Sequence, residues 1–362
     1  MNKTFYDKVT IIITRHYENR FLIQLLKYFQ IYEFPFRIII LDSSDKPIDI
    51  YQELKLKNSS LIQYELFNKS INMFEKILLG LEKVATPYSV ICSDDDFITV
   101  DGILKSVEFL ETNKDYSVAH GNYISFETKN KNNEIEFCPN RIQHYNSIED
   151  ESCIERFREH FIKYEIPTYS AVHKTELLTS ILKETVQYTD DYRFGEILPS
   201  LLTIIYGKMK KLDVFYAARR FDISSSGQTL KNIDFYIKEN NYKEKYNRFK
   251  ECIVLHLSRA TNIQYSEAEN IIDSAMTNYL YKSFGGSLRF IKTKFLIKDI
   301  LKKLNLSQDV LSNFVKFQKK MKSHKHDFNN QVNSNVEIDY RLNDSHDYDL
   351  IKKIVLDGSN NF

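Results

Sequence analysis

The fold of this chain is decided by the stretch Tyr88-Ser89-Val90-Ile91-Cys92-Ser93-Asp94-Asp95-Asp96-Phe97. Its first half is apolar and β-branched and predicts a buried strand, which runs directly into three carboxylates. Adjacent like charges repel one another, so the triplet adds nothing to the stability of a strand end. Oxygen clusters of this kind suit Mg²⁺ or Mn²⁺, usually together with phosphate oxygens, and ligands bind at the carboxyl ends of strands in open α/β sheets. The stretch therefore predicts a metal–phosphate site; a surface turn that caps a helix is the alternative.

Apolar runs before the triplet extend this pattern into a sheet. Buried strands are expected at 9–14, 36–41 and 61–67, with amphipathic helices at 21–29 and 71–84. Nearly continuous apolar strands that alternate with helices are typical of a parallel sheet covered on both faces. The first strand is followed by neither a Gly-x-Gly-x-x-Gly nor a Walker-type loop, so the dinucleotide fingerprint and the P-loop are both excluded.

The rest of the chain divides into three further kinds of pattern. Helices are predicted at 102–113, 174–186 and 194–206, strands within 116–126 and at 212–218, and a polar loop at 129–145. From about 232 to 325 the apolar spacing is helical only, and the chain is rich in Asn and Asp from 331 onward. We therefore expect an α/β domain over 1–228, a helical, basic region over 229–330 and a loosely packed polar tail over 331–362.

Bulk composition narrows the class of protein. The 50 basic and 49 acidic residues leave a net charge of +1, which argues against a globally basic nucleic-acid binder. The 4 cysteines are scattered and form no Cys-x-x-Cys pair, so no zinc knuckle or redox motif is predicted and reduced thiols are expected. No apolar run has the length of a signal peptide or a membrane-spanning helix, which favours a cytoplasmic protein.

One segment of the helical region is strongly basic. Between 282 and 325, twelve Lys and Arg residues stand against Asp299 and Asp309, a local net charge of +10. Apolar residues are interleaved with the charges, as in amphipathic helices that lie on anionic membranes. The segment predicts peripheral contact with the inner face of the membrane, or binding of a lipid-linked or phosphorylated acceptor. A solvated helix face is the alternative.

Taken in order, these pieces resemble the GT-A glycosyltransferases, in particular the family-2-like group. The resemblance spans about 8–226 and rests on the strand at 9–14, Leu41-Asp42-Ser43-Ser44, Ser93-Asp94-Asp95-Asp96 and Thr189-Asp190-Asp191. It implies a Rossmann-like mixed, mainly parallel sheet flanked by helices, here with a helical C-terminal extension. It also implies a bacterial-type, metal-dependent, inverting enzyme. Such an enzyme moves a sugar from a nucleoside diphosphate sugar to a glycan hydroxyl, as in the assembly of surface polysaccharides or glycoconjugates.

The resemblance also implies roles for the residues at the strand ends. Asp96 is the predicted direct ligand of Mn²⁺ or Mg²⁺, and Asp94 is predicted to face both the metal and the ribose. Alternate residues of an extended segment point the same way, so these two carboxylates can share one site. Asp95 belongs to the same donor pocket but is expected to be mainly structural. The other predicted contacts to the nucleotide sugar are Thr14, Arg15, Asp42, Asn72 and Arg220.

The later acidic pair supplies the candidates for the catalytic base. Asp191 is the first choice, Asp190 is the alternate, and Glu196 lies one helical turn further on. A base must reach the acceptor hydroxyl within about 3 Å. The competing interpretation is that this pair only caps the helix predicted at 194–206.

Two departures from the family pattern leave rival functions open. A late His that many relatives use for the metal is absent, and the matching stretch reads Arg219-Arg220-Phe221-Asp222. Asp222 or waters would have to complete the metal shell, or Arg219 and Arg220 would stabilise the diphosphate instead. The usual Gly is also missing after the second strand. One rival is a nucleotidyltransferase acting on sugar phosphates, although the loop after the first strand lacks the glycines that such enzymes carry. The other is a catalytically inactive glycan- or membrane-binding relative with the GT-A fold.

Overall fold

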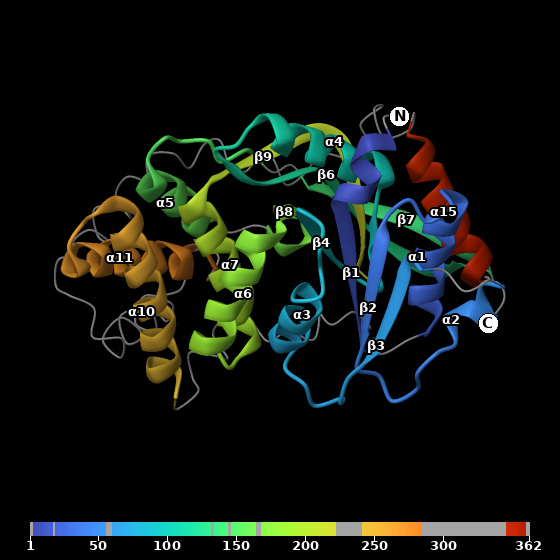
Figure 1. Cartoon of the computed structure of the whole chain (residues 1–362), viewed down its shortest axis with the longest axis horizontal. Helices are drawn as coiled ribbons and strands as arrows, with labels where there is room; N and C mark the ends of the chain where they lie inside the picture. The colour runs from blue at the N-terminus through green and yellow to red at the C-terminus, as the bar shows by residue number, and fades with distance from the viewer. Residues whose placement is uncertain are drawn as a thin grey trace.

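The computed structural model describes residues 3–16, 19–55, 60–131, 134–143, 146–163, 168–221, 241–283 and 345–359. Within these ranges a mixed β-sheet runs through the molecule, and helices cover both of its faces (Figure 1). The strands lie in the order β3-β2-β1-β4-β8-β6-β9-β5, and β7 pairs with β6. The α/β class and the helical extension predicted from the sequence are confirmed.

The first half of the sheet is parallel. It consists of β1 (Val9–Arg15), β2 (Arg37–Asp42), β3 (Ile62–Leu66) and β4 (Tyr88–Ser93). In the register of these strands, Arg15 lies opposite Asp42 and Thr14 lies opposite Ser93. The carboxyl ends of β1, β2 and β4 therefore meet at one edge of the sheet, and the acidic triplet follows the last of them.

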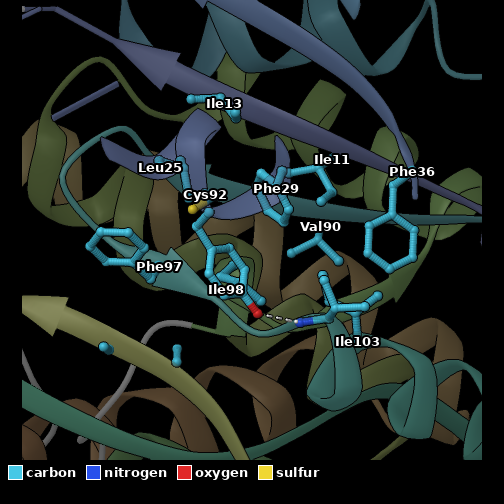
Figure 2. Close-up of a cluster of buried hydrophobic side chains, with 14 of the residues drawn as sticks. Ile11, Ile13, Leu25, Phe29, Phe36, Val90, Cys92, Phe97, Ile98 and Ile103 are labelled. Carbon is cyan, nitrogen blue, oxygen red and sulfur yellow. Dashed lines mark hydrogen bonds between the residues drawn. The ribbon is translucent and has the colours of Figure 1, made fainter. Parts of the chain in front are cut away.

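The strands are apolar on both faces because each face packs against helices. Odd-numbered residues of β1 join a cluster with α1 (Asn19–Ile31) and α4 (Val100–Thr112). Figure 2 shows the side chains of this cluster that β1, β4 and α1 contribute, namely Ile11, Ile13, Val90, Cys92, Leu25 and Phe29. Ile12 points to the opposite cluster, which contains α3 (Met73–Leu81), α6 (Thr175–Tyr188) and α7 (Tyr192–Tyr206). This alternation is the two-residue period of a strand.

The second half of the sheet positions the end of β9. β8 (Val172–Lys174) runs antiparallel to β4 and to β6 (Tyr116–Lys131), and β9 (Lys208–Arg220) runs parallel to β6. The short strand β5 (Phe97–Ile98) comes directly after the triplet and pairs with β9, so that Phe97 lies opposite Ala218. This pairing brings Arg219 and Arg220 next to the triplet.

The prediction of a polar loop at 129–145 is wrong for most of that range. β6 extends to Lys131, and residues 134–143 form β7 (Glu134–Gln143), which pairs with β6 in an antiparallel hairpin. Phe137 anchors the hairpin by stacking on Phe126, with ring centroids 4.6 Å apart. Among the β7 side chains whose burial is described, only Phe137 is buried, so the strand lacks the continuous apolar run of a buried strand and its sequence looked like a loop.

Three further helices form the side of the molecule away from β1–β3 (Figure 1). α5 (Cys153–Lys163), α10 (Tyr242–Thr261) and α11 (Tyr265–Ser283) pack against one another, and α5 and α10 pack against α7. They share the apolar cluster of α6 and α7; the rings of Phe194 and Phe249, for example, lie 4.6 Å apart.

The domain boundary predicted at residue 228 stays a prediction. The basic segment falls almost entirely outside the described residues. None of the helices in the described ranges combines the length and the apolar content needed to cross a membrane. The other short elements are η1 (Lys3–Lys8), α2 (Ile50–Glu53) and η2 (Thr168–Ser170).

The prediction of a loosely packed tail is wrong for residues 346–359. These residues form α15 (His346–Ser359), which packs against α1 and β7. Tyr348, Ile351 and Val355 are buried at helical spacing, and Asp347 accepts hydrogen bonds from the hydroxyls of Tyr28 (2.8 Å) and Tyr32 (2.5 Å). Polar residues separate these buried residues in the sequence, so the apolar stripe is narrow and hard to recognise. A narrow stripe is nevertheless sufficient to hold a surface helix against the core.

This packing predicts unequal effects of two neighbouring substitutions. Ile351→Ala should lower the free energy of unfolding by about 2–5 kcal/mol because it leaves a cavity between α15 and the sheet. Lys352→Ala, on the exposed face of the same helix, should change it by less than about 0.5 kcal/mol. Urea unfolding followed by circular dichroism measures both, and equal small effects would contradict a packed α15.

Candidate active site

The candidate site lies at the edge where β1, β2 and β4 end. Two backbone hydrogen bonds continue the strand pairing beyond the sheet: Asp94 N donates to the carbonyl of Thr14 (3.2 Å), and Ser43 N donates to the carbonyl of Arg15 (3.1 Å). The start of the acidic triplet is thereby held beside Thr14. The turn after β2 lies on the other side of the same strand.

The acidic triplet is sheltered from water. Asp96 is buried, and Asp94 and Asp95 are half-buried. Burial, and then repulsion between the neighbouring carboxylates, raises the pKa of Asp94 well above its usual range and the pKa of Asp95 to about 7. Oδ2 of Asp94 is buried and has no hydrogen-bond partner in the part of the chain described. A partnerless carboxylate oxygen in an acidic cluster fits a Mg²⁺ or Mn²⁺ ion, since both prefer oxygen ligands.

Both oxygens of Asp96 already have partners from β9. Oδ1 accepts a hydrogen bond from the backbone N of Arg220 (3.0 Å), and Oδ2 lies 3.3 Å from Nε of Arg219. A cation at Asp96 would therefore compete with Arg219. Of the two predicted ligands, Asp94 is the one whose oxygen is left without a partner.

The two arginines at the end of β9 point in different directions. The Arg220 guanidinium packs over the rings of Phe21 (4.4 Å) and Phe126 (4.9 Å) and donates to Gln24 Oε1 (3.0 Å), so this predicted donor contact is buried against α1. Its backbone N, rather than its side chain, touches the triplet. Arg219 was predicted only to stabilise the diphosphate together with Arg220, and its side chain is the one that faces Asp96.

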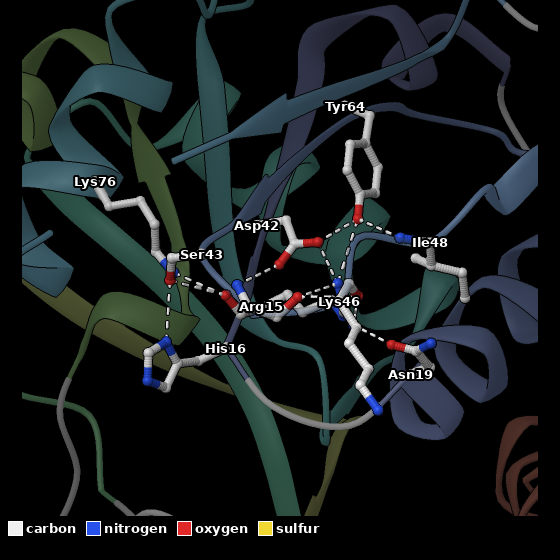
Figure 3. A network of polar contacts seen from close by, with 10 residues as sticks. Arg15, His16, Asn19, Asp42, Ser43, Lys46, Ile48, Tyr64 and Lys76 are labelled. Carbon is white, nitrogen blue, oxygen red and sulfur yellow. Dashed lines mark hydrogen bonds and ion pairs between the residues drawn. The ribbon is translucent and has the colours of Figure 1, made fainter. Parts of the chain in front are cut away.

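Arg15 and Asp42, both predicted to contact the nucleotide, bind each other (Figure 3). Both side chains are fully buried, and Asp42 also accepts hydrogen bonds from the Tyr64 hydroxyl and from Ser44 N (2.8 Å). Arg15 additionally donates to Ser44 Oγ (2.7 Å). The pair forms because the two residues lie opposite each other in the register of β1 and β2, which the sequence does not reveal.

Lys76 is a residue of this site that the sequence analysis missed. Its side chain is 3% exposed, and Nζ donates to the carbonyl of Arg15 (2.9 Å) and to Ser43 Oγ (2.8 Å). Burial lowers the pKa of Lys76 to about 8, although the charges of Asp94 and Asp42 oppose this shift. The available signal was its spacing: Lys76 lies four residues before Gly80, which packs directly on Leu41 of β2.

Asn72 has a structural role at the start of α3. Its side-chain Oδ1 accepts a hydrogen bond from the backbone N of Phe74 (2.8 Å) and so caps the helix that carries Lys76. The rest of the Asn72 side chain is exposed at the end of α3. Its contact with the donor stays a prediction.

The second acidic pair lies at the start of α7, and its two members differ. Asp190 is exposed and pairs with Arg248 of α10. Oδ1 of Asp191 caps α7 by accepting from Phe194 N (2.9 Å), whereas its Oδ2 is buried and without a partner among the described residues. Burial raises the pKa of Asp191. The capping interpretation and the catalytic interpretation are therefore compatible, because each uses a different oxygen.

Aromatic residues connect this pair with the triplet. The ring of Tyr192 lies 6.0 Å from that of Phe74 on α3, and the Tyr192 hydroxyl hydrogen-bonds Tyr169. Burial raises the pKa of Tyr169 to about 12, and the charges of Arg219, Glu196 and Asp96 all act on it. Glu196 is buried and pairs with Arg193 (3.1 Å). The N-terminal turn of α7 therefore lies within electrostatic reach of Asp96, across Tyr169.

Comparisons with known proteins show only distant likeness. No family model and no curated protein matches this sequence. Among solved structures, the chain is similar to S. aureus TarS, at 12% identity and a TM-score of 0.46, over 84% of this chain and 50% of that one. It is also similar to TarS 1–349 in complex with UDP-GlcNAc, at 12% identity and a TM-score of 0.45, over 88% and 92% of the two chains. The chain thus spans about half the length of the longer TarS structure, and its function is inferred from the residues of the site.

The buried ammonium of Lys76 predicts a dependence of stability on pH. Its folded-state pKa of about 8 lies below the ordinary 10.5, so the unfolded state binds more protons between these values and stability rises with pH across that window. Relative to Lys76→Met, the wild type should gain about 2 kcal/mol of unfolding free energy between about pH 7 and pH 9.5.

Denaturant unfolding at the two pH values measures this difference. Lys83→Met, at an exposed position just after α3, is the matched control and should show no such change. A wild-type-minus-Lys76→Met difference that does not vary with pH would contradict a buried charge at this position.

Proposed function

We propose that this protein is a GT-A-type glycosyltransferase that transfers a sugar from a nucleoside diphosphate sugar to a glycan hydroxyl. The observation that carries the proposal is the partnerless Oδ2 of Asp94, in a sheltered carboxylate triplet at the carboxyl end of β4. Lone carboxylates are expensive to bury, so such an oxygen is best explained by a ligand. The proposed ligand is Mn²⁺ or Mg²⁺ together with the diphosphate of the donor.

The donor half of the site would use charges from three elements. Asp94 and Asp96 would hold the ion, which when bound acts as a Lewis acid on the leaving diphosphate. Arg219 and Lys76 place cationic groups on either side of the triplet, where they would balance the phosphate charge. Thr14, Asn72 and Asp95 would contact the nucleotide sugar. Arg15 and Asp42 would fix the strand ends beneath it rather than bind it directly.

The acceptor half would depend on Asp191. Its Oδ2 would accept the proton of the acceptor hydroxyl. At the same time the hydroxyl oxygen would bond to the anomeric carbon, and the bond from that carbon to the diphosphate would break. A single displacement of this kind inverts the anomeric configuration. The raised pKa of Asp191 makes it a stronger base than an exposed carboxylate. Asp190 and Glu196 are less suited because Arg248 and Arg193 already pair with them.

The proposed acceptor is a glycan or lipid-linked glycan of surface polysaccharide or glycoconjugate assembly. Contact with the inner face of a membrane through 282–325 belongs to this proposal, and nearly all of that segment lies outside the described residues. An assay of products separates the rivals. Transfer releases the nucleoside diphosphate, a nucleotidyltransferase releases diphosphate from a nucleoside triphosphate, and an inactive binding protein releases neither.

Donor binding should require both the ion and Asp94. A thermal-shift panel of UDP, GDP, CMP and dTDP, each with and without Mn²⁺, should show one nucleotide that stabilises the protein only with Mn²⁺. Stabilisation should be about 2.7 kcal/mol at a ligand concentration of 100 Kd. Asp94→Asn and Asp96→Asn should abolish it, whereas Asp45→Asn, at an exposed position paired with Lys69, should not. A full shift in Asp94→Asn would remove Asp94 from the site.

Two adjacent carboxylates provide a matched test of the base. Asp191→Asn should lower kcat about 10²–10⁴-fold with little change in donor affinity. Asn caps helices as well as Asp, so α7 should stay folded in this variant. Asp190→Asn should retain turnover within a few-fold, since it loses only the exposed pair with Arg248. The reverse pattern, with Asp190→Asn inactive and Asp191→Asn active, would exchange the two roles.

A further inference from the structure

A second group of metal-binding residues lies between α6 and α10, outside the candidate active site. It consists of Glu184 on α6 and of Cys252 and His256 on α10. One ligand atom from each residue lies within 4.8 Å of the other two. Cys252 and His256 are buried, and Glu184 is half-buried. The sequence analysis found no cysteine motif because the third residue comes from another helix.

Helix geometry explains why the three side chains meet. Cys252 and His256 are four residues apart and so lie on one face of α10, one turn from each other. That face packs against α6, as Figure 1 shows by the neighbouring positions of the two helices. Oε2 of Glu184 lies 3.6 Å from Nε2 of His256. Sulfur, nitrogen and oxygen therefore converge on one point from two helices.

The imidazole of His256 is oriented like that of a metal ligand. Its Nδ1 contacts the hydroxyl of Tyr206, which fixes the ring. Its Nε2 is buried and faces Oε2 of Glu184 at 3.6 Å, longer than an ordinary hydrogen bond. Metal-binding histidines are commonly held in this way, with one ring nitrogen on a polar partner and the other on the ion.

We propose that Glu184, Cys252 and His256 form a Zn²⁺ site that joins α10 to α6. Zinc accepts thiolate, imidazole and carboxylate together, whereas Mg²⁺ and Mn²⁺ favour oxygen alone, so the donor set selects zinc. Three protein ligands leave one tetrahedral position for water, which can enter on the half-exposed side at Glu184.

The charges at the site suit a divalent ion. Zinc binding releases the Cys252 thiol proton to solvent, and the resulting thiolate and the Glu184 carboxylate neutralise Zn²⁺. Burial raises the pKa of the Cys252 thiol and lowers the pKa of His256. Arg259 is the nearby cation on α10. Because the zinc complex is neutral, it does not repel the Arg259 guanidinium.

The position of this site links it to the proposed catalytic base. α6 ends at Tyr188, just before Asp190 and Asp191, and α10 carries Arg248, the partner of Asp190. An ion that joins the two helices therefore holds the segment between α6 and α7 from both sides. Its role is structural, because no described residue of the triplet belongs to the cluster.

Cobalt titration of the chelator-treated full-length protein tests the site. Co²⁺ should produce a thiolate-to-cobalt charge-transfer band in the near ultraviolet that saturates at one equivalent, and Zn²⁺ should remove the band by displacing the cobalt. Cys252→Ser should remove the band, and His256→Gln and Glu184→Gln should each weaken Zn²⁺ binding by at least about 10–100-fold. Cys153→Ser, at a half-buried thiol on α5, is the matched control and should retain the band.

The outcomes separate this site from the acidic triplet. Asp94→Asn should keep the charge-transfer band, because carboxylates alone do not produce it. No band in the folded wild type, or a band that survives Cys252→Ser, would overturn the proposal. If Cys252→Ser does not fold, His256→Gln decides. An unchanged Zn²⁺ affinity in His256→Gln would overturn the site as well.

Discussion

The buried ion pair between Arg15 and Asp42 is the interaction on which the candidate site depends. Two fully buried charges persist only if each satisfies the other, and removing one partner of such a pair typically costs about 3–5 kcal/mol. The pair joins the last residues of β1 and β2, and hydrogen bonds to Tyr64 and Ser44 complete it. It therefore fixes the backbone carbonyl of Arg15, to which both Ser43 and Lys76 bind.

This network sets the electrostatic balance at the end of the sheet. Lys76, held by β1 and β2, and Arg219, held by β9, bring positive charge to a triplet that would otherwise be purely repulsive. Asp96 is neutralised in this way, but Oδ2 of Asp94 is not. The apolar strands and helices exclude water from this edge of the sheet. Without water, the remaining carboxylate charge raises the free energy of the folded protein. A bound cation is the simplest way to remove that cost.

Local patterns in the sequence were sufficient to predict the main strands and helices and to locate the acidic triplet at the end of a strand. β1, β2 and β4 are continuous apolar runs, and Asp191 precedes a helix that it does cap. Pairings between distant segments were not predictable. The contact of Arg15 with Asp42 depends on strand register, and that of Arg219 with Asp96 depends on how β5 pairs with β9. α15 was missed because it buries only a narrow apolar stripe, and β7 was missed because Phe137 is the one buried residue among its described side chains. The Glu184–Cys252–His256 group was missed because its members come from two helices.

The central claim is that Asp94 presents its partnerless oxygen to a divalent ion, and anomalous scattering tests it most directly. Crystals of the protein grown with Mn²⁺ and the nucleotide it binds would be measured at the manganese absorption edge. The account predicts an anomalous peak about 2.0–2.6 Å from Oδ2 of Asp94, a distance typical of such ions and carboxylates. A nucleotide bound at the strand ends with no manganese peak at Asp94 would contradict it.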